Sequence, residues 1–517
     1  MRAVFAAQGR RCHRLLKHVQ RAILKSPNTG IQAVTLDRKD GMKRYEQLAE
    51  EFSASIRNGV MKPGDRMPSV RQASSSRGVS ASTVFEAYYL LEARGLIRAQ
   101  ERSGYYVTAG GHQLPPEPEL PLAGETASLP VKVSDLVFSV LAAVRTRDVA
   151  PLGSAFPSPL LYPLPRLARS LAHAAHAMDP WNTVDDITPG HAGLRRQIAL
   201  RYLADGVYVQ PDDIVITNGA LEALNLCLQT VTRPGDAVVV ESPTFYGALQ
   251  ALENLGLKAI EVPSNPREGI DLDLLAQALD MYRPAACWLM TNFQNPLGSL
   301  MPDEKKRALV GLLAAHVIPL IEDDVYGELY FGKRRPLPAK AFDEAGLVLH
   351  CSSFSKCLAP GYRLGWAIPG QFCQRVSRLK LMRTLAVAAP VQEGLCDYLV
   401  RGGYDRHLRQ LRQALCRQQV ALATAVLRHF PAGTRATRPE GGYFLWVELP
   451  HGVDTLALHA QGCALGISTA PGPMFSARAA FGHCMRLNYG HPWSDALEEA
   501  IATLGRLAGA QLAALKI

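Results

Sequence analysis

The sequence has neither a paired-cysteine pattern nor a long apolar run. Its ten cysteines are scattered over 517 residues without a CxxC pair or even spacing. This distribution argues against a disulfide framework and a zinc site, and favours a reducing cytoplasm. No uninterrupted apolar stretch approaches the roughly 20 residues that a membrane helix needs. We therefore expect a cytoplasmic protein with no metal site and no membrane partner.

Acidic residues are missing from the start of the chain. Arginines and lysines recur from Arg2 onward, whereas the first acidic residue is Asp37. Residues 1–41 also show no core pattern, so we expect this basic extension to be disordered. It has three interpretations: an arm that touches phosphate, an organellar targeting segment, or a stretch upstream of the true translation start. We favour the last, because "MKRYEQLAEEF" from Met42 opens an amphipathic helix.

The next segment shows a compact helical pattern. Apolar residues recur every four positions from Leu48 to Ile56, which predicts an amphipathic helix. A turn at Pro63-Gly64 precedes a short helix from Ser69. A further helix begins near Ser80, which has the side chain of an N-cap. "LIRAQERSGYYV" then predicts two short strands, and helices followed by a hairpin indicate a winged helix-turn-helix.

This segment resembles the DNA-binding domain of GntR-type bacterial regulators. The resemblance rests on "KPGDRMPSVRQ", "GVSASTV" and "LEARGLI", followed by a wing that contains glycine. It implies that double-stranded DNA is a partner. Ala81 and Phe85 depart from some relatives, which carry arginines there, so the DNA sequence stays open. By position, the residues expected to contact DNA are Arg71, Ser82 and Thr83, with Gly104 letting the wing approach the minor groove.

A Pro- and Gly-rich linker separates this head from a longer body. Beyond the linker, short apolar strands such as "DIVITNG", "DAVVVESP" and "LVLHCSSFS" alternate with helical segments. This alternation predicts an α/β fold with a mostly parallel sheet covered by helices. In such sheets a ligand binds beyond the carboxyl ends of the strands. The chemically suggestive residues of the body follow its predicted strands directly.

One lysine has a neighbourhood that offers its charge no partner. In "SSFSKCLAPGYRLGW", residues 352–366, Lys356 is flanked by small, hydroxyl and apolar side chains without a carboxylate. A charged amine is costly to bury. Lys356 is therefore either an ordinary loop lysine before the turn at Pro360, or an amine that is held as an imine with an aldehyde.

Residues after the other strands describe that aldehyde. After "TNG", the backbone N–H groups of Gly219, Ala220 and Leu221 would bind an anion at a helix start. Asp323 would keep a pyridine nitrogen protonated and so make the ring an electron sink. With Lys356, these features predict pyridoxal 5′-phosphate. Its other expected contacts are Ser353, Ser355 and Arg363 at the phosphate, Asn295 and Tyr326 at the phenolate oxygen, and Phe245, or alternatively Tyr246, against the ring.

Residues 145–510 resemble fold type I aminotransferases in the order and spacing of these motifs. The match includes "SFSK" followed by "RLGW", "GGYFLWVEL" at 441–449 and "MRLNYG" at 485–490. The resemblance implies a smaller C-terminal α/β subdomain beside the main sheet. It also implies that Arg486 binds a substrate carboxylate bidentately. Because fold type I sites form at a dimer interface, it further implies a homodimer.

A GntR-type head on an aminotransferase-like body is the architecture of the MocR subfamily, and the chain is identified as a member. The resemblance implies a transcriptional regulator that binds pyridoxal phosphate as an aldimine on Lys356. Its effector would be an amine, an amino acid or the cofactor itself. Two alternatives stay open: a working aminotransferase with an appended DNA-binding head, because the main catalytic residues are present, and a DNA-binding protein whose body is only a dimerisation scaffold.

The length of 517 residues also predicts division into several domains. We expect a basic extension over 1–41, a GntR-type winged helix-turn-helix over 42–109 and a linker over 110–144. The aminotransferase-like domain would cover 145–517, with its small subdomain at about 390–517.

Overall fold

The computed structural model describes residues 44–93, 95–100, 104–108, 114–118, 128–142, 149–185 and 189–515. The expected basic extension 1–41 and part of the expected linker (110–113, 119–127 and 143–144) lie outside these residues. The chain divides into two compact units, Met1–Gly111 and His112–Ile517, which we call the head and the body. Among the described residues, no helix is long and apolar enough to cross a membrane, and no cluster of His, Cys, Asp and Glu could hold a metal ion.

The described residues of the head form three helices and a hairpin, as the sequence predicts. Ser69 caps its helix through a capping box with Gln72. The Ser80 hydroxyl accepts from the Thr83 N–H at 3.1 Å, which confirms the expected cap. A hydrophobic core joins the helices to the hairpin. The elements are α2 (Arg44–Arg57), α3 (Val70–Arg77), α4 (Ala81–Ala93), β1 (Ile97–Gln100) and β2 (Gly104–Val107), with β1 and β2 antiparallel.

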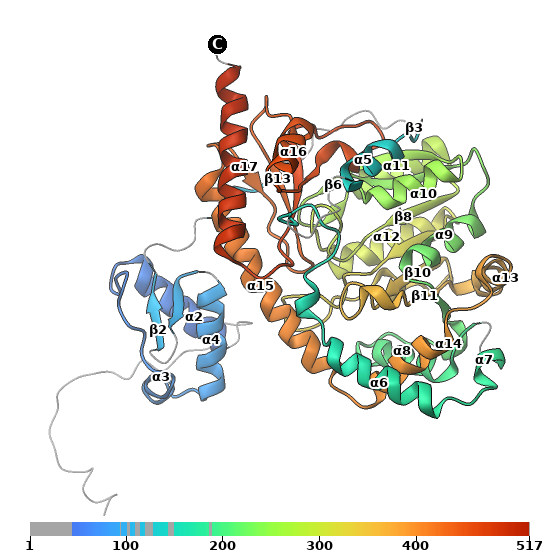
Figure 1. The fold of residues 1–517 in the computed structure, drawn as a ribbon, viewed down its shortest axis with the longest axis horizontal. Helices are drawn as coiled ribbons and strands as arrows, with labels where there is room; N and C mark the ends of the chain where they lie inside the picture. The colour runs from blue at the N-terminus through green and yellow to red at the C-terminus, as the bar shows by residue number, and fades with distance from the viewer. Residues whose placement is uncertain are drawn as a thin grey trace, which may run out of the picture. The chain divides into compact units, whose positions relative to one another are not determined.

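The body is built on a mixed sheet whose centre is parallel (Figure 1). Strands β6, β5, β8, β9 and β10 are parallel neighbours in that order, whereas β3, β11 and β4 add antiparallel pairs at the edges. The predicted mostly parallel sheet is therefore confirmed. Its strands are β3 (Ser128–Pro130), β4 (Val215–Thr217), β5 (Ala237–Ser242), β6 (Lys258–Asn265), β7 (Gly269–Ile270), β8 (Ala286–Leu289), β9 (Leu320–Asp323), β10 (Val348–Ser353) and β11 (Gly365–Ile368).

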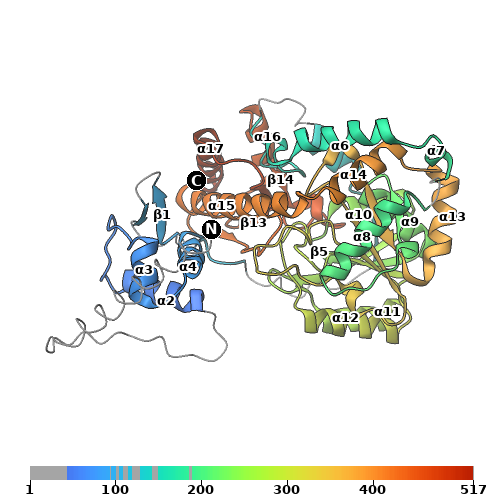
Figure 2. The same ribbon diagram turned by 90° about the horizontal axis from the view of Figure 1, so that it is seen from below.

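Helices cover both faces of this sheet because successive strand residues point to opposite sides. Val239 and Cys287 pack beneath α11 and α12, whereas Val238 and Trp288 share the other core with α8, α9 and α10 (Figure 2). From α5 to α12, the helices of the body are α5 (Ser134–Ala142), α6 (Leu164–Ala177), α7 (Asn182–Asp185), α8 (Ala192–Ala204), α9 (Ala220–Val231), α10 (Tyr246–Asn254), α11 (Leu272–Tyr282) and α12 (Asp303–Ala315).

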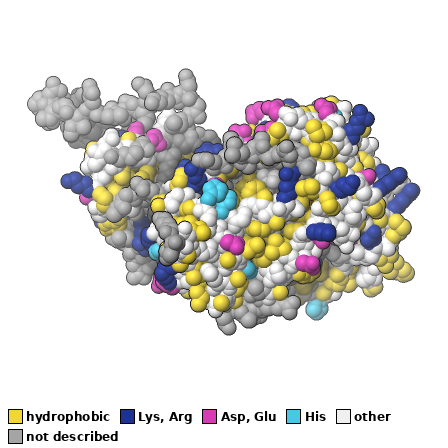
Figure 3. Space-filling view, turned by 90° about the horizontal axis from the view of Figure 1, so that it is seen from above, with side chains coloured by type: hydrophobic (Ala, Val, Ile, Leu, Met, Phe, Trp, Pro, Cys, Tyr) yellow, Lys and Arg dark blue, Asp and Glu magenta, His cyan; other side chains and the backbone are white. Residues whose placement is uncertain are grey.

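The C-terminal part forms the smaller subdomain. The long helix α15 leads from the large sheet to an antiparallel sheet in the order β12-β13-β15-β14 (Figure 1). In the space-filling view of Figure 3, hydrophobic side chains of the described residues are exposed over much of the face that is shown. The elements are α13 (Cys373–Thr384), α14 (Ala389–Val400), α15 (Tyr404–His429), β12 (Arg435–Ala436), β13 (Phe444–Glu448), α16 (Thr455–Ala464), β14 (Ala470–Pro471), β15 (Cys484–Asn488) and α17 (Asp495–Ala514).

Candidate functional sites

The carboxyl ends of the parallel strands surround a cavity of about 210 Å³. The cavity lies where the rule for open α/β sheets places a ligand. Gly219 and Arg486 do not line it directly but contact residues that do. The predicted site residues that line it are Ala220, Leu221, Phe245, Asn295, Asp323, Tyr326, Ser353, Ser355, Lys356 and Arg363.

Lys356 is held in this cavity by backbone and aromatic contacts. Its Nζ donates to the Ala155 carbonyl at 3.0 Å and lies 3.8 Å from the centre of the Phe156 ring. Burial, helped by the positive charge of Arg486, lowers the pKa of Lys356 to about 7 although Asp323 opposes the shift. Near neutral pH the amine is therefore substantially deprotonated, which is the form that attacks a carbonyl.

Asp323 is a buried carboxylate with an open acceptor. Its side chain ends β9, the residue is 1% exposed, and its Oδ1 has no hydrogen-bond partner among the described residues. Burial raises the pKa of Asp323 to about 7. A buried oxygen without a donor is costly, so the site fits a bound group that supplies one.

The start of α9 and Arg363 form an end of the cavity suited to an anion. No side chain caps α9, whose first residue follows Gly219 at φ 89°. Of the three N–H groups expected to bind an anion, that of Gly219 donates to the Thr217 carbonyl at 2.9 Å, which leaves those of Ala220 and Leu221. Within the described part of the chain, Arg363 donates to the Ser355 hydroxyl and the Asn218 carbonyl, both at 3.4 Å.

Two glycines without side chains, Gly219 and Gly247, leave room for Arg363 and for the ring of Phe245. A Cβ on Gly219 would lie 2.6 Å from the Arg363 guanidinium, and a Cβ on Gly247 would lie 2.5 Å from the Phe245 ring. Tyr246, the alternative ring contact, also lines the cavity, and its ring centre is 4.9 Å from that of Phe245. Gly247 thus supports the predicted aromatic wall, a role that the sequence analysis missed.

Asn295, Tyr326 and Ser353 already have partners inside the protein. Asn295 Oδ1 accepts from Arg486 at 3.0 Å, so its amide nitrogen is the group left for a ligand. The hydroxyl of Tyr326 bonds with that of Tyr443. Ser353 Oγ accepts from the Ser355 N–H at 3.3 Å. These bonds orient the side chains that are predicted from the sequence to surround pyridoxal phosphate.

Arg486 is a buried cation that pairs with no carboxylate of the described residues. The residue is 1% exposed, and its Nη2 donates to the carbonyls of Gly153 and Ser154 at 2.9 and 3.3 Å. Its Nε has no hydrogen-bond partner among the described residues, and its guanidinium lies 4.0 Å from the Phe444 ring centre. Desolvation lowers the pKa of Arg486. A carboxylate is the ligand that such a planar fork matches best.

The segment around Ala155 is the main part of the site that sequence reasoning missed. Its backbone carbonyls, from Gly153 to Ala155, accept from Arg486, Lys356 and Tyr443. A carbonyl can accept whatever side chain the residue carries, so no sequence signal announces these bonds. The cavity also includes Phe156, Leu224, Gln250 and Met290.

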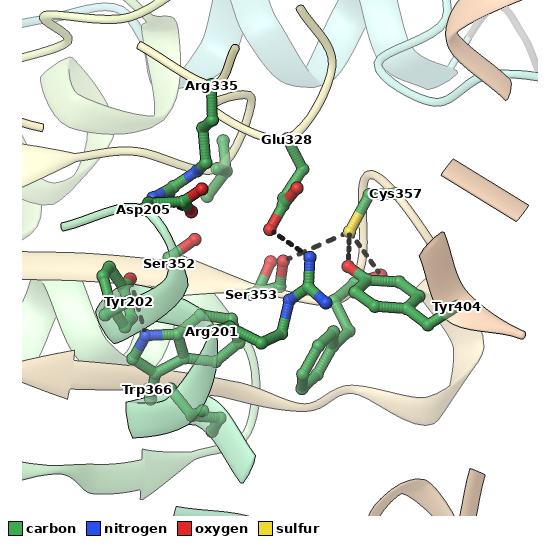
Figure 4. Close-up of a pocket in the computed structure, with 13 residues that line it drawn as sticks. Arg201, Tyr202, Asp205, Glu328, Arg335, Ser352, Ser353, Cys357, Trp366 and Tyr404 are labelled. Atoms are coloured by element: carbon green, nitrogen blue, oxygen red, sulfur yellow. Dashed lines mark hydrogen bonds and ion pairs between the residues drawn. The ribbon is translucent and has the colours of Figure 1, made fainter. Parts of the chain in front are cut away.

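A second pocket is lined by polar side chains that include Arg201, Glu328, Arg335, Cys357 and Tyr404 (Figure 4). Immediately beyond β9, Asp324 Oδ2 pairs with Arg335 at 2.6 Å. Next to Lys356, the thiol of Cys357 lies 3.0 Å from the Tyr404 hydroxyl. These contacts hold the strand end that bears the carboxylate and the turn that bears the amine.

The predicted DNA-contacting residues lie on three elements of the head. Arg71 is exposed in the first turn of α3, whereas Ser82 and Thr83 lie in the first turn of α4. The hydroxyls of these two residues are each 2.8 Å from that of Ser80. Gly104 begins β2 with φ 104°, and Arg66, which the sequence analysis missed, comes within 3.5 Å of the Cβ position of that glycine.

Comparison with known proteins assigns both units. Residues 44–107 match the family of bacterial regulatory proteins of the gntR type, and residues 151–502 match aminotransferase class I and II. The HTH-type transcriptional regulator YdcR of Escherichia coli is 47% identical over 90% of this chain and 99% of its own length. Aromatic-amino-acid aminotransferase 1 of Thermococcus litoralis is 31% identical over 73% of this chain and 92% of its own.

A solved structure matches the body as well. LysN, the alpha-aminoadipate aminotransferase of Thermus thermophilus, complexed with N-(5′-phosphopyridoxyl)-L-leucine, superposes with a TM-score of 0.66 at 28% identity. The match covers 74% of this chain and 100% of LysN. The chain therefore belongs to the MocR-type regulators of the GntR family, HTH transcriptional regulators with a class I and II aminotransferase domain.

Proposed function

We propose that the body binds pyridoxal 5′-phosphate covalently through Lys356 and that an amine, an amino acid or the cofactor itself controls DNA binding by the head. One observation carries the proposal. A depressed-pKa amine and a buried carboxylate with an open oxygen, Lys356 and Asp323, face one cavity. Neither has an ion-pair partner among the described residues. Condensation of the Nζ amine with an aldehyde would release one water and remove the buried amine.

The surrounding groups fit the rest of this cofactor. The N–H groups of Ala220 and Leu221, with Arg363, would hold a phosphate at the start of α9. Asp323 would accept a hydrogen bond from the protonated ring nitrogen of the cofactor. The bound ring would then supply an electron sink. The complex of LysN with a phosphopyridoxyl amino acid supports this assignment, because its fold is that of the body.

The second candidate function is transamination by the same site. Arg486 supports it, because a buried guanidinium without a carboxylate would bind the carboxylate of an amino acid. The related aminotransferase of Thermococcus litoralis supports it as well. Steady formation of the pyridoxamine form with amino acid and a 2-oxo acid acceptor would favour turnover, whereas a stable spectral change without product would favour sensing.

We also propose a homodimer. The supporting observation is exposed apolar area on the body, where Leu160, Trp181 and Met382 are 84%, 71% and 76% exposed. Burial of such side chains against a second copy of the chain would remove them from water, which is favourable. Sedimentation equilibrium of the full chain measures this directly, and a monomer at micromolar concentration would contradict the proposal.

Covalent attachment is tested by reduction and mass spectrometry. The protein loaded with pyridoxal phosphate should be yellow, and borohydride reduction should place the cofactor on Lys356. Reduction converts the imine to a stable secondary amine, so the Lys356→Ala variant should retain no cofactor at position 356 after reduction. Attachment of the cofactor to another lysine of the wild-type protein would overturn the site assignment.

DNA binding by the head is tested at Arg71. Replacing Arg71 by alanine removes an exposed cation beside the recognition helix, so it should weaken binding to any duplex and flatten the dependence of affinity on salt, with a slope lower by about one unit of log K per log salt. Arg233, an exposed cation of the body, offers a control, because Arg233→Ala should leave both quantities unchanged. An unchanged salt slope in Arg71→Ala would remove this residue from the interface.

A further inference from the structure

The recognition helix α4 presents an outward face without a cation. Ser82, Phe85, Glu86 and Tyr89 recur at intervals of three and four residues, and all four are exposed. The helix, "ASTVFEAYYLLEA", contains no lysine or arginine. Base recognition from this face therefore depends on hydroxyl groups, one carboxylate and apolar contact.

Phe85 is the residue on this face that the head does not need for its core. Its side chain is 54% exposed, whereas Val84, Ala87 and Tyr88 on the opposite face are fully buried. Those buried residues pack on α2 and the hairpin and form the hydrophobic core without it. Phe85 follows Ser82 by one turn, so it lies next along the edge that would enter a groove.

We propose that Phe85 reads the DNA sequence by contact with the C5 methyl group of a thymine in the major groove. This inference rests on the proposed DNA contact of α4 and deepens it. A phenyl ring has no donor or acceptor, so it would desolvate the polar edges of guanine, cytosine or adenine without compensation. The thymine methyl is the apolar group that the major groove offers. Phe85 therefore selects thymine at one position in each half-site.

The experiment removes that methyl group and nothing else. A duplex is first selected from a random pool with the full-length protein loaded with pyridoxal phosphate. Each thymine is then replaced in turn by deoxyuridine, and the Kd is measured for the wild type and for Phe85→Ala. We expect one position in each half-site at which deoxyuridine weakens wild-type binding about fourfold, the factor for one buried methyl. The same replacement should leave Phe85→Ala binding unchanged.

A matched variant separates the contact from general loss of apolar surface. Val60 is another exposed apolar residue of the head, at 75% exposure, and lies outside α4. Val60→Ala should keep the full deoxyuridine effect. If Phe85→Ala retains that effect at every thymine, the inference is overturned while DNA binding stands. If the wild type selects no duplex, the proposed DNA contact itself fails.

Discussion

At the scale of single residues, the protonation state of the Lys356 amine sets the reactivity that we propose for the body. Its amine contacts a carbonyl and an aromatic ring, and burial lowers its pKa to about 7. An ordinary lysine keeps its proton until about pH 10. The cavity therefore makes one lysine a nucleophile under conditions in which exposed lysines are not.

This difference predicts the pH dependence of cofactor loading. The rate at which apoprotein reacts with pyridoxal phosphate should rise as pH increases through about 7, because the neutral amine reacts, and should level off above it. The control is Lys356→Ala, whose slower reaction at exposed lysines should keep rising beyond about pH 9. The ratio of the two rates cancels the titration of the cofactor. With the depressed pKa, the ratio of wild-type to variant rate should fall as pH rises above about 7, and a ratio that stays constant up to about pH 10 would contradict it.

Asp323 and Tyr326 should differ in importance because they face different charges. Asp323 would bond a full positive charge in a buried site, whereas Tyr326 would donate one hydrogen bond to an oxygen. We expect Asp323→Ala to slow the spectral reaction with amines roughly 10- to 100-fold and Tyr326→Phe by less than roughly tenfold. Stopped-flow absorbance on the loaded variants measures both rates, and an equal or reversed order would count against the assigned roles.

The sequence allowed Lys356, Asp323 and the residues at the start of α9 to be predicted because they follow strands, and parallel strands bring their carboxyl ends together. It gave no sign of the contacts made by Ala155. That residue acts through its backbone carbonyl, and it lies 201 positions before Lys356 in a sequence with no pattern that pairs the two. Side-chain chemistry could be read from the sequence, but backbone contacts between distant segments could not.

At the scale of elements, the alternation of strands and helices predicted the parallel centre of the sheet but not its edge. Strand β11 pairs antiparallel with both β10 and β4. An antiparallel neighbour needs no crossover helix, so the spacing along the chain does not reveal it. Gly365, which begins β11, approaches the backbone of Gly219 so closely that a Cβ would lie 2.5 Å from it. Strand β11 thus brings Arg363 to the start of α9.

The start of α9 provides a prediction with a matched control. Gly219→Ala should lower the affinity for pyridoxal phosphate at least tenfold, since its Cβ would lie 2.6 Å from the Arg363 guanidinium and displace it; a loss of about 1.4 kcal/mol has that effect. Gly206 has a similar φ of 84° but open space around its Cβ position. Gly206→Ala should cost similar backbone strain yet leave cofactor affinity unchanged. Equal losses in the two variants would assign the effect to strain alone.

At the scale of the whole molecule, the part of the linker that the structure describes is docked on the body. The Pro116 carbonyl accepts from the Ala436 N–H at 2.8 Å, at the outer edge of β12. Glu117 pairs with Arg267 beside the large sheet at 2.7 Å and with Arg438 of the small subdomain at 3.6 Å. A change in the separation of these subdomains must therefore alter at least one of the two pairs.

The ion pairs of Glu117 with Arg267 and Arg438 predict a variant in which amine binding in the cavity no longer affects DNA binding by the head. Glu117→Gln should leave the binding of amines to the cavity unchanged, as measured from the visible spectrum. It should reduce the effect of amine on operator affinity by up to about fivefold, the range of a partly exposed ion pair. Glu268→Gln, in the same turn as Arg267 but paired with Lys305, is the control. Equal coupling in both variants would show that the bridge transmits nothing.

The last prediction concerns whether the cavity controls the head at all. If the proposal holds, an amino acid bound in the cavity would leave Lys356 free and place its own carboxylate near Arg486, whose hydrogen bonds to the carbonyls of Gly153 and Ser154 would then have to break. A ligand shifts a regulator only if it binds the alternative arrangements unequally. Coupling of about 1–3 kcal/mol, a change in operator affinity of roughly 5- to 150-fold, is typical.

The measurement is operator affinity with and without candidate amines and pyridoxal phosphate, in the wild type and in Lys356→Ala. The wild type should respond to at least one of these ligands, and Lys356→Ala should lose the response to amines while it keeps its basal affinity for the operator. Identical wild-type affinities under all conditions would show that the body only holds two heads together. A response that survives in Lys356→Ala would instead place the sensing contact outside the amine chemistry of that lysine.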